Sequence, residues 1–422
     1  MKIKVKEVDF DQIKDKTFPK RKKPLKPNMF WRVLIKILSA SALAPLNFEY
    51  KKTGMERLGK KEPCLVLMNH SCFNDFEIAS TMLFPRPLNI VTTFDGMVGK
   101  AWLMRQIGCI PTIKYVSDLG LVRDLSYTVK KLKSSVLMYP EACYSFDGTA
   151  TVLPDSLGKF IKMLGVPVIM IKTEGAFSRN PLYNDLQTRK VPLRAEMKYL
   201  LSSDELAQKS DSEISAIVAA EFSFDSFKWQ RESGIKITEP FRADKLNRVL
   251  YKCPHCLAEG KTEGKGIYLT CHACGKKYEL DELGYMKAID GETEIEHIPD
   301  WYAWERKCVR EEIERGNYSL DVDVDIYVLA DTKCVYKVGE GRLTHNASGL
   351  TLTGCDGKLN YTQKPKASYS LNADYFWYEM GDVICLGNTK VSYYCFPKNC
   401  GDVVAKARLA TEELYKIEMR KQ

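Results

Sequence analysis

The sequence lacks a long apolar run. None of its stretches approaches the roughly 20 uninterrupted apolar residues that a membrane-spanning helix requires. The best candidate, residues 29–48, contains Arg32 and Lys36 early and Pro45 late. We therefore expect no polytopic membrane protein.

The sequence also lacks an internal repeat of 20 to 50 residues and any low-complexity tract beyond its basic start. No small-residue cleavage site follows a clean apolar core, so the 14 cysteines do not indicate a secreted scaffold. We expect the protein to lie in a reducing cytoplasm. With 45% hydrophobic and 28% charged residues, the 422-residue chain excludes wholesale disorder and a coiled-coil rod, and its length predicts two or three domains.

Positive charge is concentrated at the start of the chain. The formal net charge is +9, and residues 1–50 hold 12 Lys and Arg against 5 Asp and Glu, which leaves +2 for the rest. Residues 1–27 contain Pro19, Pro24 and Pro27 and predict an extended or loosely held arm.

An amphipathic helix is predicted from Asn28 onward. Its apolar residues recur at helical spacing, and Arg32 and Lys36 share another face. The apolar positions are Phe30, Val33, Leu34, Ile37 and Leu38. Together, residues 1–50 suit the surface of an anionic membrane. The alternative is a first helix that packs on its own domain.

Residues 51–240 are expected to form an α/β domain with a mixed sheet flanked by helices, because short apolar runs alternate with helical patterns. The predicted strands are Cys64–Met68, Leu88–Thr92, Ile110–Ile113, Ser135–Tyr139 and Pro167–Ile171. Residues 204–231 predict a long closing helix or two shorter ones. Function in such folds lies where the strands end.

Two further regions follow. Residues 241–300 contain Cys253, Cys256, Cys271 and Cys274 in paired C-x2-C knuckles, the spacing of a structural zinc ribbon without an open position for water. Redox pairing of these thiols is the alternative, and we interpret His255 and His272 as loop residues. Residues 301–422 predict a β-rich domain with a closing helix after Gly401, similar in pattern to a pleckstrin-homology-like fold.

The chemistry is predicted at the end of the first strand of the α/β domain. There the sequence reads Asn69-His70-Ser71-Cys72-Phe73-Asn74-Asp75. On a continuous helix, residues 70 and 75 would lie about 140° apart, so a turn is needed to bring the Asp75 carboxylate to one nitrogen of His70. The other nitrogen would then face the cleft as a general base.

Three more motifs follow in order. They are Gly108-Cys109-Ile110-Pro111-Thr112-Ile113-Lys114, Pro140-Glu141-Ala142-Cys143-Tyr144-Ser145 and Val166-Pro167-Val168-Ile169. With the N-H-x4-D box, this order resembles the lysophosphatidate (1-acylglycerol-3-phosphate) acyltransferase family over roughly residues 45–230. The resemblance implies that His70 deprotonates an acceptor hydroxyl, that Asp75 supports the imidazolium, and that Asn69, Lys114, Glu141 and Ser145 bind substrate.

The motifs depart from the family pattern in two places. Lys114 stands where the family has Arg, and Ala142, Cys143 and Tyr144 replace Gly, Thr and Arg of the third motif. One phosphate-binding cation is therefore missing, for which Lys100, Arg105, Arg123 and Lys159 are candidate substitutes. Cys72 and Cys143 also raise the alternative of a nucleophilic cysteine, which the family does not use at these positions.

The resemblance implies an O-acyltransferase on the inner face of the membrane. The acyl donor would be acyl-coenzyme A or acyl carrier protein, and the acceptor a lysophospholipid hydroxyl like that of 1-acylglycerol 3-phosphate. Two alternatives stay open: a different lipid acceptor, or a lipid-binding adaptor without turnover, which the altered third motif favours. Nucleic acid is not expected as a partner, because the ribbon region is not strongly basic.

Overall fold

The computed structural model describes residues 2–71 and 74–421. A seven-stranded sheet forms the centre of the α/β domain, in the order β2-β8-β7-β3-β6-β4-β5, and all its pairings are parallel except β7 with β8. The strands are β2 (Glu49–Thr53), β3 (Leu65–Met68), β4 (Leu88–Thr93), β5 (Cys109–Thr112), β6 (Ser135–Met138), β7 (Val168–Glu174) and β8 (Arg194–Leu201). The five predicted strands are confirmed, and β2 and β8 were not predicted.

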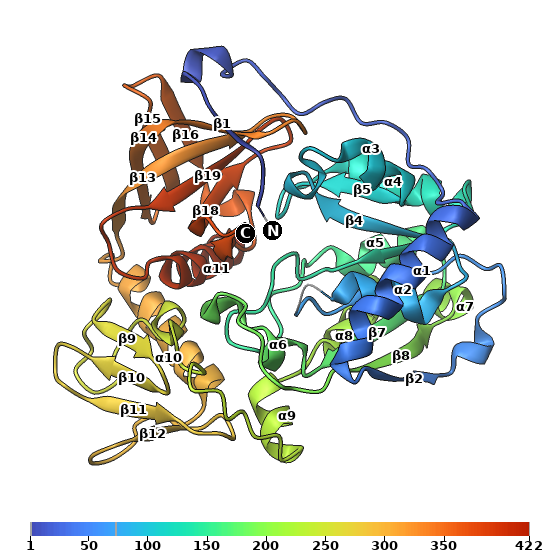
Figure 1. The fold of residues 1–422 in the computed structure, drawn as a ribbon. Coiled ribbons are helices and arrows are strands. Elements are labelled where there is room, and N and C mark those ends of the chain that lie inside the picture. Colours follow the sequence, from blue (N-terminus) through green and yellow to red (C-terminus); the bar gives the residue numbers. More distant parts are fainter. Residues whose placement is uncertain (1, 72–73, 422) are drawn as a thin grey trace.

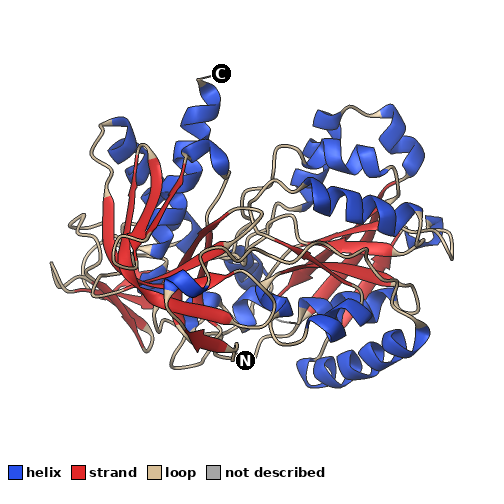
Figure 2. Ribbon diagram, turned by 90° about the horizontal axis from the view of Figure 1, so that it is seen from above, coloured by secondary structure: helices blue, strands red, loops and turns tan. Residues whose placement is uncertain are grey.

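Helices cover both faces of this sheet, as Figure 2 shows in its right half. One face packs against α1 (Met29–Leu43) and α2 (Asp75–Leu83), and the other packs against α4 (Leu119–Lys130), α5 (Leu157–Leu164) and α8 (Asp211–Glu221). The remaining helices of this domain are α3 (Ala101–Gln106), α6 (Ala176–Arg179), α7 (Ser203–Gln208) and α9 (Ser226–Glu232). Both faces of the parallel strands are thus buried, which explains their continuous apolar runs.

The closing segment of this domain differs from the expectation of one or two helices. Three helices, α7, α8 and α9, occupy residues 203–232. Ser202 with Glu205 and Ser210 with Glu213 each form a capping box, so the chain restarts a helix at both points.

The ribbon and the C-terminal domain are both antiparallel. The ribbon strands β9 (Thr262–Lys265), β10 (Tyr268–Cys271), β11 (Lys277–Leu280) and β12 (Met286–Ala288) form a four-stranded sheet. The C-terminal sheet contains β13 (Leu320–Leu329), β14 (Val335–Asn346), β15 (Gly349–Gly354), β16 (Leu359–Gln363), β17 (Asn372–Trp377), β18 (Gly381–Gly387) and β19 (Ser392–Pro397). The closing helix α11 (Val404–Arg420) confirms the expected β-rich domain with a final helix.

A long helix crosses the predicted boundary at residue 300. The expectation of β-rich structure beyond about Trp301 is wrong there, because α10 spans Ile298–Glu314. Pro299 in its first turn and the buried residues Trp301, Tyr302 and Val309 follow helical spacing. In Figure 1, α10 lies between the ribbon and the C-terminal domain.

The N-terminal arm is packed in part, against the expectation of a loosely held segment. Strand β1 (Val5–Glu7) pairs in parallel with β14, and Phe10 and Ile13 are buried in the core of the C-terminal domain. Further along, Phe18 stacks on Phe94 with ring centroids 4.3 Å apart. The arm therefore joins the C-terminal domain to the α/β domain (Figure 1). Its few apolar side chains, which lie among lysines in the sequence, make these contacts.

Helix α1 lies on the α/β domain, where it packs against α2. The Arg32 guanidinium donates a hydrogen bond to the carbonyl oxygen of Pro85. Against the expectation from the sequence, the segment Met29–Leu46 is long and apolar enough to cross a membrane by length and composition, and only 17% of it is buried.

Candidate active site and candidate metal centre

A cavity of about 920 Å³ lies between the α/β domain and the C-terminal domain. One wall comes from the carboxyl ends of β4, β5 and β6, and the opposite wall from β17 and α11. His70 and Asp75, which follow β3, also line it. Ligands of open α/β sheets bind at this edge of the strands, so the cavity lies where the fold places function.

His70 and Asp75 are in direct contact. The Nδ1 atom of His70 lies 2.8 Å from Oδ2 of Asp75, and the same carboxylate oxygen accepts the backbone N–H of Ser71 at 3.0 Å. Asp75 is the first residue of α2 and is 2% exposed, so the helix N-terminus helps to hold its negative charge. The predicted contact between these two side chains is present, and His70 lines the cavity.

Two tyrosines enclose the imidazole. The ring of His70 stacks on Tyr139 with centroids 4.2 Å apart and on Tyr144 with centroids 4.1 Å apart. Both tyrosines line the cavity. The rotation of the His70 ring is therefore restricted on both faces, and its side chain stays 20% exposed.

Glu141 lies behind the active-site turn. Its side chain is buried and accepts the backbone N–H of His70 at 3.0 Å and of Thr151 at 2.8 Å. Burial raises the pKa of Glu141 to about 7, although both N–H donors lower it. Because the N–H groups of His70 and Ser71 are already bound to carboxylates, neither is available to an oxyanion.

Asn69 and Ser145 are also buried, away from the cavity lining. Asn69 accepts the N–H of Thr173 at 2.8 Å and donates to the hydroxyl of Ser71. Ser145 accepts the N–H of Gly148 and donates to the carbonyl oxygen of Thr149. Of the four residues predicted to bind substrate, all of them described, only Lys114 lines the cavity. In this structure the other three hold the loops in place.

Lys114 faces acidic groups. Burial lowers its pKa, but Cys143, Asp374 and Asp95 outweigh this effect and keep the pKa above its usual value. Asp374 belongs to β17 of the C-terminal domain, and burial raises its pKa to about 6 while Lys114 opposes the shift. Cys143 is buried, and its Sγ lies 3.7 Å from Nζ of Lys114. It does not line the cavity, and Cys72 lies outside the described residues.

Arg408 of helix α11 is a buried cation that contacts the third motif. Arg408 is 4% exposed, and its guanidinium lies 4.5 Å from the centroid of the Phe146 ring. It donates to the carbonyl oxygen of Tyr144 at 3.4 Å, and Glu412 lies within 3.4 Å on the same helix. The loop that carries Tyr144 is thus supported from the C-terminal domain.

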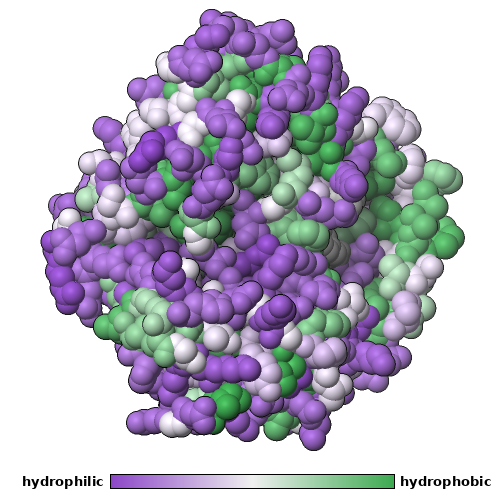
Figure 3. Space-filling view, turned by 60° about the vertical axis from the view of Figure 1, so that its left-hand side comes forward, coloured by the Kyte–Doolittle hydropathy of each residue, from purple (hydrophilic) through white to green (hydrophobic). Residues whose placement is uncertain are grey.

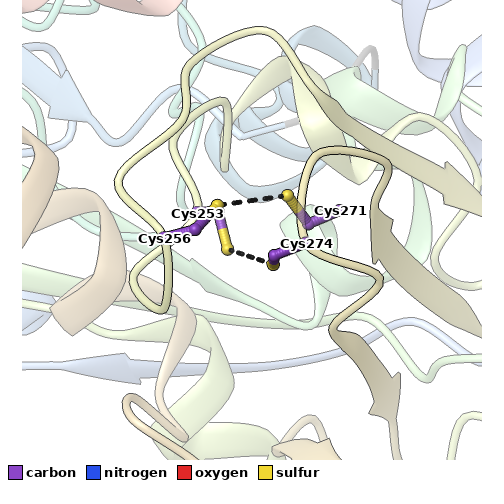
Figure 4. Close-up of side chains that lie close together, drawn as sticks. All are labelled: Cys253, Cys256, Cys271 and Cys274. Carbon is purple, nitrogen blue, oxygen red and sulfur yellow. Dashed lines mark hydrogen bonds between the residues drawn. The ribbon is translucent and has the colours of Figure 1, made fainter.

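The four ribbon cysteines converge (Figure 4). Their Sγ atoms lie within 4.8 Å of one another, with Cys253 to Cys274 at 3.9 Å and Cys256 to Cys271 at 3.7 Å. Tetrahedral coordination with Zn–S bonds of about 2.3 Å places sulfurs about 3.8 Å apart, so the cluster fits a tetrahedral metal ion. His255 and His272 contact Glu294 and Glu263 instead, as expected of loop residues.

No protein-family model and no curated protein matches the sequence. Among solved structures, the chain is similar to the 1-acyl-sn-glycerophosphate acyltransferase PlsC from Thermotoga maritima. The match has 16% sequence identity and a TM-score of 0.34, and it covers 45% of this chain and 76% of the other. A likeness of this size carries no conclusion about activity.

Proposed function

We propose that the protein is an O-acyltransferase that moves a fatty acyl group from a thioester, acyl-coenzyme A or acyl carrier protein, to the hydroxyl of a lysolipid. The observation that carries this proposal is the His70–Asp75 pair at a large cavity that is lined in part by apolar side chains. Apolar lining residues from the α/β domain are Ile90, Val91, Ile113, Leu121, Leu125 and Phe160. Such a wall suits an acyl chain.

The proposed step needs one base. With Nδ1–H donating to Asp75, Nε2 of His70 accepts the proton of the acceptor hydroxyl as its oxygen attacks the thioester carbonyl carbon. The tetrahedral intermediate then breaks its C–S bond. The thiolate leaves with the two electrons of that bond and takes the proton from Nε2, so an ester and a free thiol are formed. The carboxylate of Asp75 stabilises the transient imidazolium.

The test is His70→Ala, assayed with acyl-coenzyme A or acyl carrier protein and a panel of lysolipids by mass spectrometry of the products. We expect acyl transfer to fall by about 10²- to 10⁴-fold, with circular dichroism and metal content unchanged. His272→Ala is the matched control, because His272 is exposed and lies outside the cavity. Full activity of His70→Ala would refute the proposal. A wild type that binds lysolipid without any transfer would instead support the adaptor without turnover.

We also propose that the protein works peripherally at a cytoplasmic membrane surface. Five apolar side chains of α1 are exposed, together with Trp102 of α3, and basic residues of the arm adjoin them. The exposed side chains of α1 are Met29, Phe30, Val33, Ile37 and Leu38. The apolar area at the right-hand edge of Figure 3 lies where α1 stands in that view. An apolar face beside lysines suits an anionic bilayer.

The membrane proposal is tested with Ile37→Glu/Leu38→Glu in flotation with anionic vesicles. We expect the bound fraction to fall about tenfold or more, because two exposed apolar side chains that would enter the bilayer are replaced by charges. Ile289→Glu, an exposed apolar position of the ribbon, is the matched control. Equal binding of the double variant and the wild type would refute the role of α1.

For the metal centre, we propose structural zinc held by Cys253, Cys256, Cys271 and Cys274. Four thiolates leave no open coordination position, so the ion would organise the ribbon and take no part in acyl transfer.

A further inference from the structure

The cavity has few cations for a phosphate. Among the described residues that line it, the basic side chains are Lys114 and Lys366, whereas six carboxylates line it. The carboxylates are Asp75, Asp95, Asp118, Asp155, Asp374 and Glu379. Lys366 is exposed, whereas Lys114 is half-buried.

The candidate substitute cations do not reach the cavity. Lys100, Arg105, Arg123 and Lys159 are absent from its lining, and Arg105 donates to the carbonyl oxygens of Lys22 and Lys23 in the arm. In the third motif, Tyr144 stands where the family pattern has the arginine that binds phosphate. The ring of Tyr144 stacks on His70. None of these four side chains therefore replaces the missing cation, and Arg408, which contacts the third motif from α11, is also absent from the cavity lining.

Acidic groups already favour the charged form of Lys114. Asp374 and Asp95 both act through space to raise the pKa of Lys114, and Tyr378 hydrogen-bonds to Asp95. Carboxylates therefore outnumber ammonium groups in the described lining of the cavity. A phosphate bound to Lys114 would share the cavity with both carboxylates, and we expect the repulsion between like charges to cost about tenfold or more in affinity.

Hydroxyl groups fit this arrangement better. A hydroxyl accepts a hydrogen bond from an ammonium and donates one to a carboxylate, so a group with several hydroxyls satisfies Lys114, Asp95 and Asp374 together. An amine would donate to the carboxylates and leave the ammonium unmatched. Trp377 and Tyr369 of the C-terminal domain add aromatic surface to the same wall.

We infer that the acceptor carries no phosphate, and that its head group is an uncharged hydroxyl-bearing group, as in a monoacylglycerol, held between Lys114, Asp95 and Asp374. The inference rests on the proposed acyl transfer and narrows its acceptor. It also gives the C-terminal domain a part in specificity, because Asp374 comes from β17.

The experiment compares two acceptors that differ only in the phosphate, 1-oleoylglycerol and 1-oleoylglycerol 3-phosphate, with oleoyl-coenzyme A and the full chain in neutral detergent micelles. We expect kcat/KM to be at least about tenfold higher for 1-oleoylglycerol. A preference for the phosphate-bearing acceptor would overturn the inference and leave the acyl transfer standing. Absence of transfer to both acceptors would overturn the inference if the lysolipid panel yields a product with either donor, and absence of transfer throughout the panel would remove the proposed function as well.

A charge variant sharpens the result. Asp95→Asn/Asp374→Asn removes both carboxylates beside Lys114, and we expect the ratio of the two kcat/KM values to shift toward the phosphate-bearing acceptor by about tenfold or more. Asp321→Asn/Asp323→Asn, on the exposed face of β13, is the matched control and should leave the ratio unchanged. An unchanged ratio in the folded cavity variant would contradict the role of the two carboxylates. If that variant does not fold, the wild-type ratio decides.

Discussion

Short sequence motifs predict both the four-cysteine cluster of the ribbon and the cavity at His70. The two sites differ in how far apart their residues lie along the chain. All four cysteines lie within 22 residues of chain, and two short knuckles bring them together. The cavity instead joins strand ends of the α/β domain with β17 and α11, which lie up to about 350 residues further along the chain. A motif therefore specifies a local site nearly completely and a site between domains only in part.

The largest effect is expected where the site is local. Cys271→Ser should abolish stoichiometric zinc binding and lower the melting temperature by about 10 °C or more, because a structural zinc contributes on the order of 10 kcal/mol to the folding of its module. The loss should spread to α10, since Tyr278 of the ribbon packs edge-on against Trp301 with centroids 5.1 Å apart. Metal analysis and a thermal melt measure both.

The control for this variant is His272→Ala, which changes the neighbouring loop but no sulfur ligand and should keep its zinc. A folded Cys271→Ser protein with full zinc content would show that the four thiols do not form one site. A wild type without bound zinc would instead support redox pairing of the thiols.

A smaller effect is expected at Glu141, whose pKa is raised from 4.5 to about 7 by burial. Between these values the native state binds a proton that the unfolded state has released, so the contribution of Glu141 to stability decreases as pH rises through this window. The total is on the order of 3 kcal/mol. We expect Glu141→Gln to lack this decrease.

The measurement is the free energy of unfolding in urea at pH 4.5 and pH 7, and the relevant quantity is the difference between wild type and variant. Other groups cancel in that difference, including His345, whose pKa burial lowers to about 3. Glu314→Gln, at the exposed end of α10, should follow the wild type at both pH values. Parallel profiles for Glu141→Gln and wild type would contradict the raised pKa.

Local patterns explain which parts of the fold were predictable. The buried parallel strands appear as continuous apolar runs, so the five runs around β3 to β7 could be located from the sequence. Strand β2 is exposed along its whole length, and α10 carries charged residues among its apolar ones. Neither has the apolar run that marks a buried strand, and the segmentation of residues 203–232 depended on capping boxes.

The same reasoning applies to the site. The His70–Asp75 contact was predicted on the condition that His70 ends a strand and Asp75 opens a helix, because residues five apart do not meet on a continuous helix. The inward orientation of Glu141, Asn69 and Ser145 depends on how the loops fold. Asp374 and Arg408 carry no local signal, since their places in the site arise from docking of the C-terminal domain. The catalytic and binding roles remain predictions.

The smallest effect is expected for Arg408→Lys, at the contact between the C-terminal domain and the α/β domain. Arg408→Lys keeps the charge beside Glu412 but loses the planar donor that reaches the carbonyl oxygen of Tyr144 and stacks on Phe146. Because Tyr144 encloses His70, a looser loop should lower kcat by about three- to tenfold, about 1 kcal/mol, with KM nearly unchanged. Arg420→Lys, at the exposed end of the same helix, is the matched control. A purely structural role would lower the melting temperature without this change in kcat, and the active site would then depend on the C-terminal domain only through the cavity wall.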